Sequence, residues 1–521
     1  MVPISPRIQS LITVLCIMVI VATYWAILRH NGLTVQIDSV SYIRGAINLH
    51  EGKGFTHGGK LINHFPIGFS LWLNGLMYIL PGDVFHVAYW NVLFCLTGLG
   101  WMFYKISELC RIAQPVRWIG LFLFLFSMPV WYPSSMLLTE LPTLFIISIG
   151  TYWLLVYLLQ TQQKRYLIGI GFLLGITCLI RFAAIGIAGG FMAVVIWHHR
   201  RQLRTALTRI LWIGIPCLIP IISYSAYTKY VYKASAANRQ AMWHPISLGN
   251  ISLFFRTPLQ WLIDLSTAPM PLIISLLVLA LLGILAWRKK LSTFRFPLFI
   301  HQCITSPRWF TLWIMSGVYM VFISCSISLF DYSTPVNTRI LSPISIYFYL
   351  GLLMLFNKGY HQARSKKIGF AILAGFSLIF SWQTYQSMYY YNRYTTGFNK
   401  PYWRNTGKDI VCDSSGRWVN KDQTIYTNGY FFWYLYNDRP LERIPEKGSI
   451  VNRTVNPKYK VQLDSMRMEI RSGQAQLVYF KNIAQFPHKN YASDILPYFS
   501  DSTLFEIIPF EKGFSIRKRM P

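Results

Sequence analysis

Long apolar runs separated by short polar connections dominate the first 388 residues of this chain. A bilayer core about 30 Å thick is crossed by about 20 apolar helical residues, and about eleven runs meet or approach that length. An odd number of crossings places the two ends of the chain on opposite sides of the membrane. The runs lie near residues 9–29, 84–104, 117–133, 141–159, 167–181, 183–197, 210–231, 270–287, 309–330, 342–356 and 368–388.

The fifth and sixth runs leave an alternative open. They are short and are separated only by Ile180-Arg181-Phe182, so a broken or re-entrant pair is the alternative to two crossings. Losing one crossing would invert the topology of everything downstream. The basic connections that follow both pieces favour two crossings.

Three polar or amphipathic regions interrupt or follow these runs. In the first loop, 30–83, the pattern predicts an amphipathic helix over 38–50 and a second helix near 65–72 that lies in or dips into the interface. Aromatic residues in 233–263 predict another interfacial element that forms one wall of a lipid-facing cavity. After residue 388 the alternating runs 424–426, 476–480 and 514–517 and a helical stretch 430–436 predict a small α/β domain over 389–521.

Composition supports this organisation. Hydrophobic residues make up 53% of the chain and charged residues 13%, which excludes an ordinary soluble enzyme. The net charge of +30 does not indicate nucleic-acid binding, because 18 lysines and arginines crowd five short connections, as cytoplasmic loops do. The N-terminus is then cytoplasmic and the C-terminal domain periplasmic or extracellular. The five connections are 105–117, 160–165, 198–209, 288–308 and 357–367.

Other motifs narrow the chemistry. The eight cysteines show no disulfide or zinc spacing, and Arg7 precedes a first run long enough to be a retained helix instead of a signal peptide. The chain has no glycine-rich phosphate loop and no metal-binding helix with histidines four residues apart. A phosphorylated nucleotide is therefore not the expected donor.

Acidic residues are rare before residue 389 and lie on one predicted side. Only seven occur there, and Glu108 alone falls in a cytoplasmic connection. We therefore expect the chemistry at the outer face. The six acids assigned to that face are Asp38, Glu51, Asp83, Glu140, Asp264 and Asp331.

Asp38, just outside the first run, has two interpretations. It is placed to act as a general base on an acceptor hydroxyl, with Tyr42 on the same helical face and expected to contact substrate. Aspartate is also a favoured helix N-cap, and the sequence alone does not separate the two roles.

Short motifs follow one another from the first loop to the tenth run. In this order they resemble the GT-C polytopic glycosyltransferases, particularly the branch of protein mannosyltransferases and aminoarabinose lipid A transferases. The resemblance covers nearly the whole chain and implies a GT-C-like membrane domain over 1–388. The motifs are 38–55, Pro66-Ile67-Gly68-Phe69, 135–142, Gly169–Gly175 leading to Leu179-Ile180-Arg181, and 337–343.

The resemblance implies a polyprenyl-phosphate sugar donor and inversion of the anomeric centre, with Asp38 as general base. It places Glu140 near the catalytic centre, as a second catalytic residue that orients the acceptor or binds a divalent cation. The alternative for Glu140 is an exposed turn acid before Pro142. Many relatives carry a second acid beside the first-loop aspartate, whereas Ser39 stands here. A divalent cation held by Asp38 and Glu140 is therefore left open, and no other cofactor is expected.

Charged residues at the outer membrane boundary complete the expected substrate-binding set. Arg181 and Arg339 are suited to hold a lipid phosphate, and snorkelling to headgroups is the alternative for both. Asp331 lies at the same boundary as Arg339. In the first loop, Lys60 and His64, together with His57, are candidates for lining a sugar pocket or holding a metal, although no spacing selects them.

The sequence thus predicts a multi-pass hexosyl- or pentosyltransferase of the inner (plasma) membrane. Its partners are the lipid bilayer, a polyprenyl-phosphate-linked sugar and a glycan, lipid or protein acceptor. A transporter or flippase for a lipid-linked or anionic substrate, and a membrane scaffold that presents the tail, are the alternatives. Transporters generally show repeated halves and acids at mid-membrane, which this sequence does not.

Overall fold

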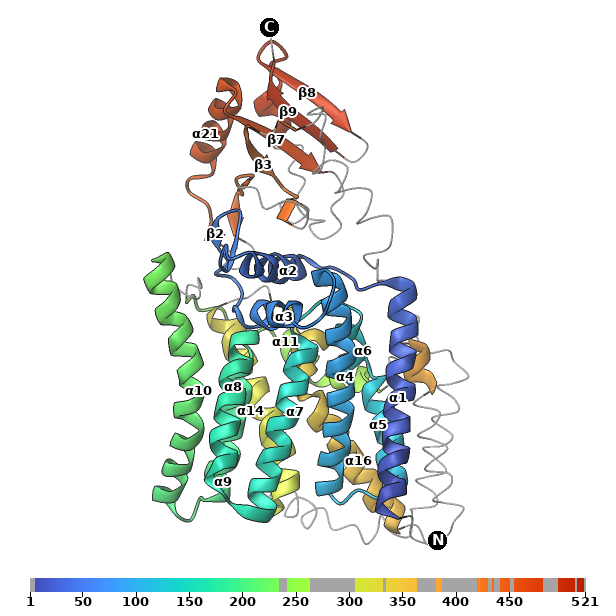
Figure 1. Ribbon diagram of the computed structural model, residues 1–521. Coiled ribbons are helices and arrows are strands. Elements are labelled where there is room, and N and C mark those ends of the chain that lie inside the picture. The colour runs from blue at the N-terminus through green and yellow to red at the C-terminus, as the bar shows by residue number, and fades with distance from the viewer. Residues whose placement is uncertain are drawn as a thin grey trace.

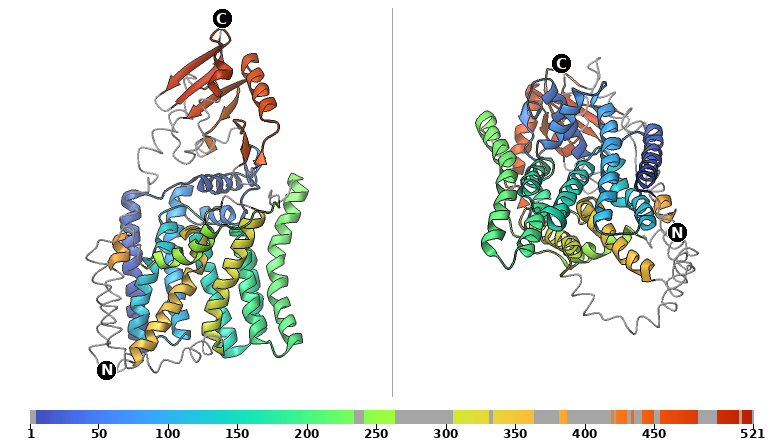
Figure 2. Two further views of the ribbon diagram at one scale, coloured as in Figure 1. Left: turned by 180° about the vertical axis from the view of Figure 1, so that it is seen from behind. Right: turned by 60° about the horizontal axis from the view of Figure 1, so that its bottom comes forward.

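A bundle of upright helices carries transverse helices at one end and a sheet domain beyond them (Figure 1). The N-terminus lies at the opposite end of the bundle from the sheet domain, and Figure 2 shows the same layers from behind. The computed structural model describes residues 5–233, 241–262, 305–330, 334–362, 381–386, 419–420, 422–429, 433–434, 441–449, 454–480, 495–510 and 513–519.

The bundle helices follow the predicted apolar runs. In the described residues, six helices are long and apolar enough to cross a membrane, and one bent pair raises this to seven. The chain is therefore a multi-pass membrane protein. The runs 270–287 and most of 368–388 lie outside the described residues, so eleven crossings stays a prediction. The bundle contains α1 (Pro6–Asn31), α4 (Val84–Leu109), α5 (Gln114–Leu125), α6 (Met128–Ser134), α7 (Glu140–Val156) extended by η1 (Tyr157–Thr161), α8 (Lys164–Ile180), α9 (Ala184–His198), α10 (Leu203–Tyr232), α14 (Pro307–Leu329) and α16 (Ser345–Gln362).

The third run, 117–133, was predicted as one span, and the structure breaks it into two helices that make either one bent span or a re-entrant pair. The chain forms α5 and α6, which are bent by 47° relative to each other. Pro129 explains the break, because its ring excludes the carbonyl of Leu125 from a helical hydrogen bond. The Tyr24 hydroxyl donates instead to the Leu125 carbonyl oxygen at 2.5 Å.

The break at residues 180–182 separates two helices, as predicted. Arg181 is extended (φ −152°, ψ 119°) between the end of α8 and the start of α9. The Tyr157 hydroxyl, before α8, lies 2.8 Å from Nε2 of His199, after α9. The two helices therefore run out and back as a hairpin, with Arg181 at the tip and both outer ends at the same end of the bundle.

Two glycines let α8 pack directly on the backbone of α10. A Cβ on Gly171 would lie 2.4 Å from the Ile213 carbonyl oxygen, and one on Gly175 would lie 2.6 Å from that of Cys217. The two glycines are four residues apart and share one face of α8, an arrangement typical of tightly packed membrane helices. The prolines 216 and 220 of α10 lie against the same two positions.

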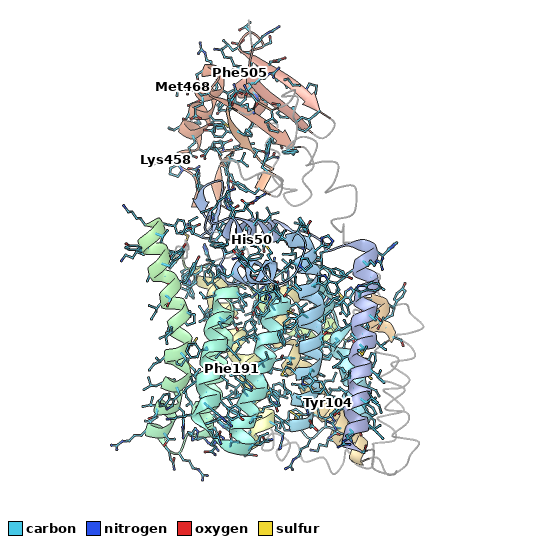
Figure 3. The ribbon with its side chains drawn as sticks, viewed as in Figure 1. His50, Tyr104, Phe191, Lys458, Met468 and Phe505 are labelled. Carbon is cyan, nitrogen blue, oxygen red and sulfur yellow. The ribbon has the colours of Figure 1, made fainter. Side chains whose placement is uncertain are left out.

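The basic connections meet at the N-terminal end of the bundle. Arg308 Nε donates to the Leu109 carbonyl oxygen at 2.7 Å, and Asn357 Oδ1 accepts from the Ala113 amide at 2.7 Å. Arg117 lies over the ring of Tyr104, 4.8 Å from its centre, near this end (Figure 3). The described basic residues of these connections thus lie at the end remote from the sheet domain.

Transverse helices cover the other end of the bundle, as the first-loop pattern predicted. The helices α2 (Ile37–His50) and α3 (Gly68–Met77) lie across the upright helices, with a hairpin of β1 (Thr56–His57) and β2 (Lys60–Leu61) between them in sequence (Figure 1). His50 marks the end of α2 in Figure 3. The region 233–263 contributes α11 (Leu248–Gln260), which buries Phe254 and exposes Phe255 and Leu259.

The terminal domain is a mixed five-stranded sheet in the order β4-β3-β7-β9-β8. The first three strands are parallel, β9 is antiparallel to both of its neighbours, and α21 (Tyr459–Ser472) packs on one face through Met466 and Ile470. The predicted strands near 424, 476 and 514 are confirmed; of the predicted helix 430–436 only Trp433 and Tyr434 are described, and they are helical. The strands are β3 (Thr424–Thr427), β4 (Leu441–Arg443), β7 (Ala475–Phe480), β8 (Phe505–Phe510) and β9 (Gly513–Lys518), with β5 (Gly448–Ser449), β6 (Thr454–Val455) and η3 (Leu496–Phe499) outside this sheet.

The α8–α10 contact makes a stability prediction. Gly171→Ala should destabilise the protein by about 1–3 kcal/mol, because the new methyl group meets a backbone carbonyl that cannot rotate away. Gly317→Ala in α14 is the matched control, since a Cβ there meets nothing within 4 Å. The control should be neutral or slightly stabilising because alanine has the higher helix propensity. Thermal unfolding in detergent checks both, and equal midpoints would contradict the packing argument.

Candidate active site

Four charged side chains meet at the end of the bundle beneath α2. Arg339 Nη2 donates to Asp38 Oδ2 at 2.5 Å, and Arg339 Nε donates to Glu140 Oε1 at 2.5 Å. Arg181 Nη1 donates to the same Glu140 oxygen. Two carboxylates and two guanidinium groups thus form one network, with Glu140 bound to both arginines and Arg339 bound to both acids.

A short parallel bridge brings the two acids to the same place. The Thr34 amide donates to the Ser135 carbonyl oxygen at 2.9 Å, and the Leu137 amide donates to the Thr34 carbonyl oxygen at 3.1 Å. Asp38 lies four residues after Thr34, and Glu140 lies four residues after Met136, the bridge partner of Thr34. Each acid therefore lies in the first turn of a helix that begins beside the bridge.

The capping role considered for Asp38 is taken by its neighbours. Gln36 is the N-cap of α2, and its backbone amide donates to the Ser39 hydroxyl oxygen at 3.0 Å. The Asp38 carboxylate does not serve as the cap and pairs with Arg339 instead. Ser39 is fully buried, so the residue that stands where many relatives carry an acid serves the start of the helix.

Arg181 is placed by a close backbone approach. A Cβ on Gly68 would lie 2.5 Å from the carbonyl carbon and oxygen of Leu179 and 2.7 Å from the Ile180 nitrogen. The first residue of α3 therefore rests on the last turn of α8, with no side chain between them. The position of the α8–α9 tip, and of Arg181, depends on that contact.

Arg339 lies in the short helix α15 (Thr338–Leu341), which is followed by η2 (Ser342–Ile344). Asn337 caps this helix by accepting from the Ile340 amide at 3.1 Å. The Tyr319 hydroxyl of α14 donates to the Ile340 carbonyl oxygen at 2.6 Å and also contacts Arg181. Sequence reasoning missed Tyr319, because a tyrosine within an apolar run gives little signal of a polar contact.

Burial divides the network into a closed and an open half. The Glu140 side chain is fully buried and that of Arg181 is 10% exposed, whereas Asp38 and Arg339 are 26% and 23% exposed. A buried carboxylate without a partner is costly, so the two guanidinium groups compensate the charge of Glu140. Glu140 is therefore not the exposed turn acid considered as an alternative, and Asp38 is the carboxylate that a ligand can reach.

Tyr42 closes the site on the side of α3. It is buried, and its ring lies 5.1 Å from that of Phe65 and 5.3 Å from that of Phe69. Burial raises the pKa of the Tyr42 phenol well above its usual range, and the Asp38 carboxylate acts in the same direction. The phenol therefore remains protonated at neutral pH.

The other predicted site residues lie elsewhere. Lys60 Nζ pairs with Glu442 Oε1 of the terminal sheet at 2.8 Å, and His64 is exposed after β2. The His57 ring lies 4.2 Å from that of Tyr434. None of these three belongs to the four-residue network, and Asp331 lies outside the described residues.

The arrangement does not favour a metal between the two acids. No group of three or more histidine, cysteine, aspartate or glutamate side chains that could hold a metal occurs in the described part of the chain. Arg339 lies between Asp38 and Glu140 and binds both. A shared cation would therefore have to displace a guanidinium group.

Comparison with known proteins identifies the fold. No family model matches the sequence, and no curated protein matches it. The chain is similar to the crystal structure of ArnT from Cupriavidus metallidurans in the apo state, with 11% identity, 98% of both chains covered and a TM-score of 0.54. The same protein bound to undecaprenyl phosphate gives 12% identity, the same coverage and a TM-score of 0.51.

A second solved protein has the same architecture. The oligosaccharyltransferase of Archaeoglobus fulgidus in the apo form is 12% identical, with 97% of this chain and 74% of that chain covered and a TM-score of 0.50. The chain therefore has the GT-C fold, as its order of motifs predicted.

Removing the buried carboxylate tests the network. Glu140→Gln should destabilise the protein by about 3–5 kcal/mol, because it leaves the buried Arg181 guanidinium without its acceptor charge. Glu51→Gln is the control, since Glu51 pairs with Lys53 at 2.6 Å and the two side chains are 44% and 57% exposed, where such pairs contribute about 0–1 kcal/mol. Thermal unfolding of the two purified variants checks this, and similar losses would contradict it.

Proposed function

We propose that this protein is an integral membrane glycosyltransferase that moves a sugar from a polyprenyl-phosphate donor to an acceptor hydroxyl, with inversion at the anomeric carbon. The observation that carries the proposal is the Asp38–Arg339–Glu140–Arg181 network at the rim of a GT-C bundle. It joins a reachable carboxylate to two guanidinium groups, which are the groups that a transfer from a lipid phosphate needs.

Asp38 acts as the general base. The acceptor oxygen attacks the anomeric carbon, its proton passes to the Asp38 carboxylate, and the bond from that carbon to the phosphate oxygen breaks. The bonding electrons leave with the phosphate, which needs no strong general acid because it is already ionised. One-quarter exposure of the Asp38 side chain allows a hydroxyl to approach it.

The two arginines stabilise the negative charge that accumulates on the leaving phosphate. Arg339 is the more exposed of the two and meets the phosphate directly. Arg181 Nε is buried and has no hydrogen-bond partner in the described residues, so it is the donor that a phosphate oxygen would satisfy. Glu140 holds both guanidinium groups in place, and its complete burial favours this anchoring role over contact with the acceptor.

The donor class and the sidedness have separate support. One of the similar solved structures is ArnT bound to undecaprenyl phosphate, which is a polyprenyl phosphate. The basic connections lie at the end of the bundle away from the network, so the positive-inside rule makes that end cytoplasmic. The protein then resides in the cell inner (plasma) membrane, and the network and the terminal domain face the periplasm or exterior.

A transporter or flippase is the competing function. Transporter folds place substrate and ion sites near the bilayer midplane, between repeated halves. The four charged residues of the network lie instead at the bundle end beneath α2, which favours transfer at the membrane surface.

Asp38→Asn should lower the rate of sugar transfer by about 10²- to 10⁴-fold, because the amide cannot accept the acceptor proton. Asp83→Asn is the control: Asp83 caps α4 at the same end of the bundle and is well exposed. The control should retain activity and expression. Substantial transfer by the Asp38 variant at wild-type expression would exclude Asp38 as the base.

Mass spectrometry of lipid-linked sugars and surface glycans, with and without the gene, tests the function itself. A sugar that is missing from the glycans and accumulates on the polyprenyl phosphate would identify donor and acceptor together. Accumulation of an untranslocated lipid-linked sugar on the cytoplasmic side would favour the flippase instead.

A further inference from the structure

The helix α2 is held on two different faces. Asp38 lies on the face toward the bundle, where it pairs with Arg339. Arg44 follows six residues later, which on a helix is about 9 Å along the axis and about 240° around it. It meets the terminal domain, so α2 lies between the bundle and the sheet domain (Figure 1).

The first contact with the terminal domain is a buried charged hydrogen bond. Arg44 Nε donates to the Tyr434 carbonyl oxygen at 2.7 Å, and Arg44 is 8% exposed. A buried hydrogen bond from a charged donor is costly to lose, because both of its groups are shielded from water. This contact therefore fixes the middle of α2 to the residues that follow β3.

Two more contacts join the hairpin after α2 to the same part of the domain. Lys60 of β2 pairs with Glu442 of β4 at 2.8 Å, and the His57 ring of β1 lies against the ring of Tyr434. The parallel strands β3 and β4 are neighbours, so the three contacts gather at one edge of the sheet. The residues they join are far apart in sequence, and no local chain connection could replace them.

We propose that Arg44 and Lys60 are positioning residues through which the terminal domain holds α2, and with it the Asp38 carboxylate, in register with Arg339. This inference rests on the proposed function of Asp38. Without the terminal domain, α2 is still held by α3, for example where the Ser70 hydroxyl donates to the Tyr42 carbonyl oxygen at 3.0 Å. We call the Arg44–Tyr434 and Lys60–Glu442 contacts the clamp. Without the clamp, α2 stays on α3 but moves more freely at its first turn, and the Asp38 carboxylate is correctly placed for less of the time.

A charge exchange isolates the Lys60–Glu442 pair. Lys60→Glu and Glu442→Lys should each lower the rate of glycan modification by roughly two- to fivefold, and the double exchange should restore it, because an exposed pair of this kind contributes little more. The readout is the sugar content of surface glycans over time in cells lacking the gene that express each full-length variant equally. Lys53→Glu is the control: Lys53 pairs with Glu51 at 2.6 Å, and both partners of this pair lie in the first loop.

Hydrogen exchange provides a readout that does not depend on catalysis. In the full chain in lipid nanodiscs, Arg44→Met should increase exchange of the amides of residues 37–43, Arg44→Lys should do so less, and Lys53→Glu should leave them unchanged. The rate of glycan modification should fall by about tenfold or more in Arg44→Met.

The outcomes separate the clamp from the proposed role of Asp38. Unchanged exchange in the Arg44 variants, or a double exchange no better than the single variants, would overturn the clamp. Faster exchange with an unchanged rate would also overturn it, because the freed helix would then not matter for transfer. An active Asp38→Asn variant would instead remove the base while leaving the exchange result intact.

Discussion

The carboxylate of Glu140, fully buried between two guanidinium groups, is the interaction on which the rest of the site depends. A buried charge is tolerated only if groups of opposite charge lie beside it. For Glu140 these groups come from distant parts of the chain. Arg181 comes from the break between α8 and α9, and Arg339 comes from a short helix after α14. Arg339 binds both Glu140 and the more exposed Asp38. The position of the exposed carboxylate therefore depends on the buried one.

Much of this could be predicted from the sequence, for an identifiable reason. Charged residues at the ends of apolar runs are rare and costly, so Asp38, Glu140, Arg181 and Arg339 each stood out singly. Their pairing did not, because Asp38 and Arg339 are 301 residues apart and nothing local fixes which acid meets which arginine. The order of motifs predicted the fold, and the amphipathic pattern predicted the transverse helix α2.

The failures also have physical causes. The bend in the third run was not predicted, because Pro129 lies within a stretch that is apolar throughout. The helix α21 and the strand β8 were missed because the polar tail mixes the helical and the strand periodicity of apolar residues over short lengths. Arg44 was overlooked because an arginine on an amphipathic helix ordinarily faces water, and only the terminal domain makes it a buried donor.

The lengths of α8 and α9 bear on how a charged headgroup gains access. At a rise of 1.5 Å per residue their 17 and 15 residues span ~25 and ~22 Å, less than the ~30 Å of a typical hydrocarbon layer. In Figure 1, the longer α10 extends beyond α8 at the end that carries α2, so the tip of the hairpin lies below that end of α10. Access by a charged headgroup is then confined to the exposed half of the network, at Asp38 and Arg339, while the Arg181 side chain at the tip stays 10% exposed.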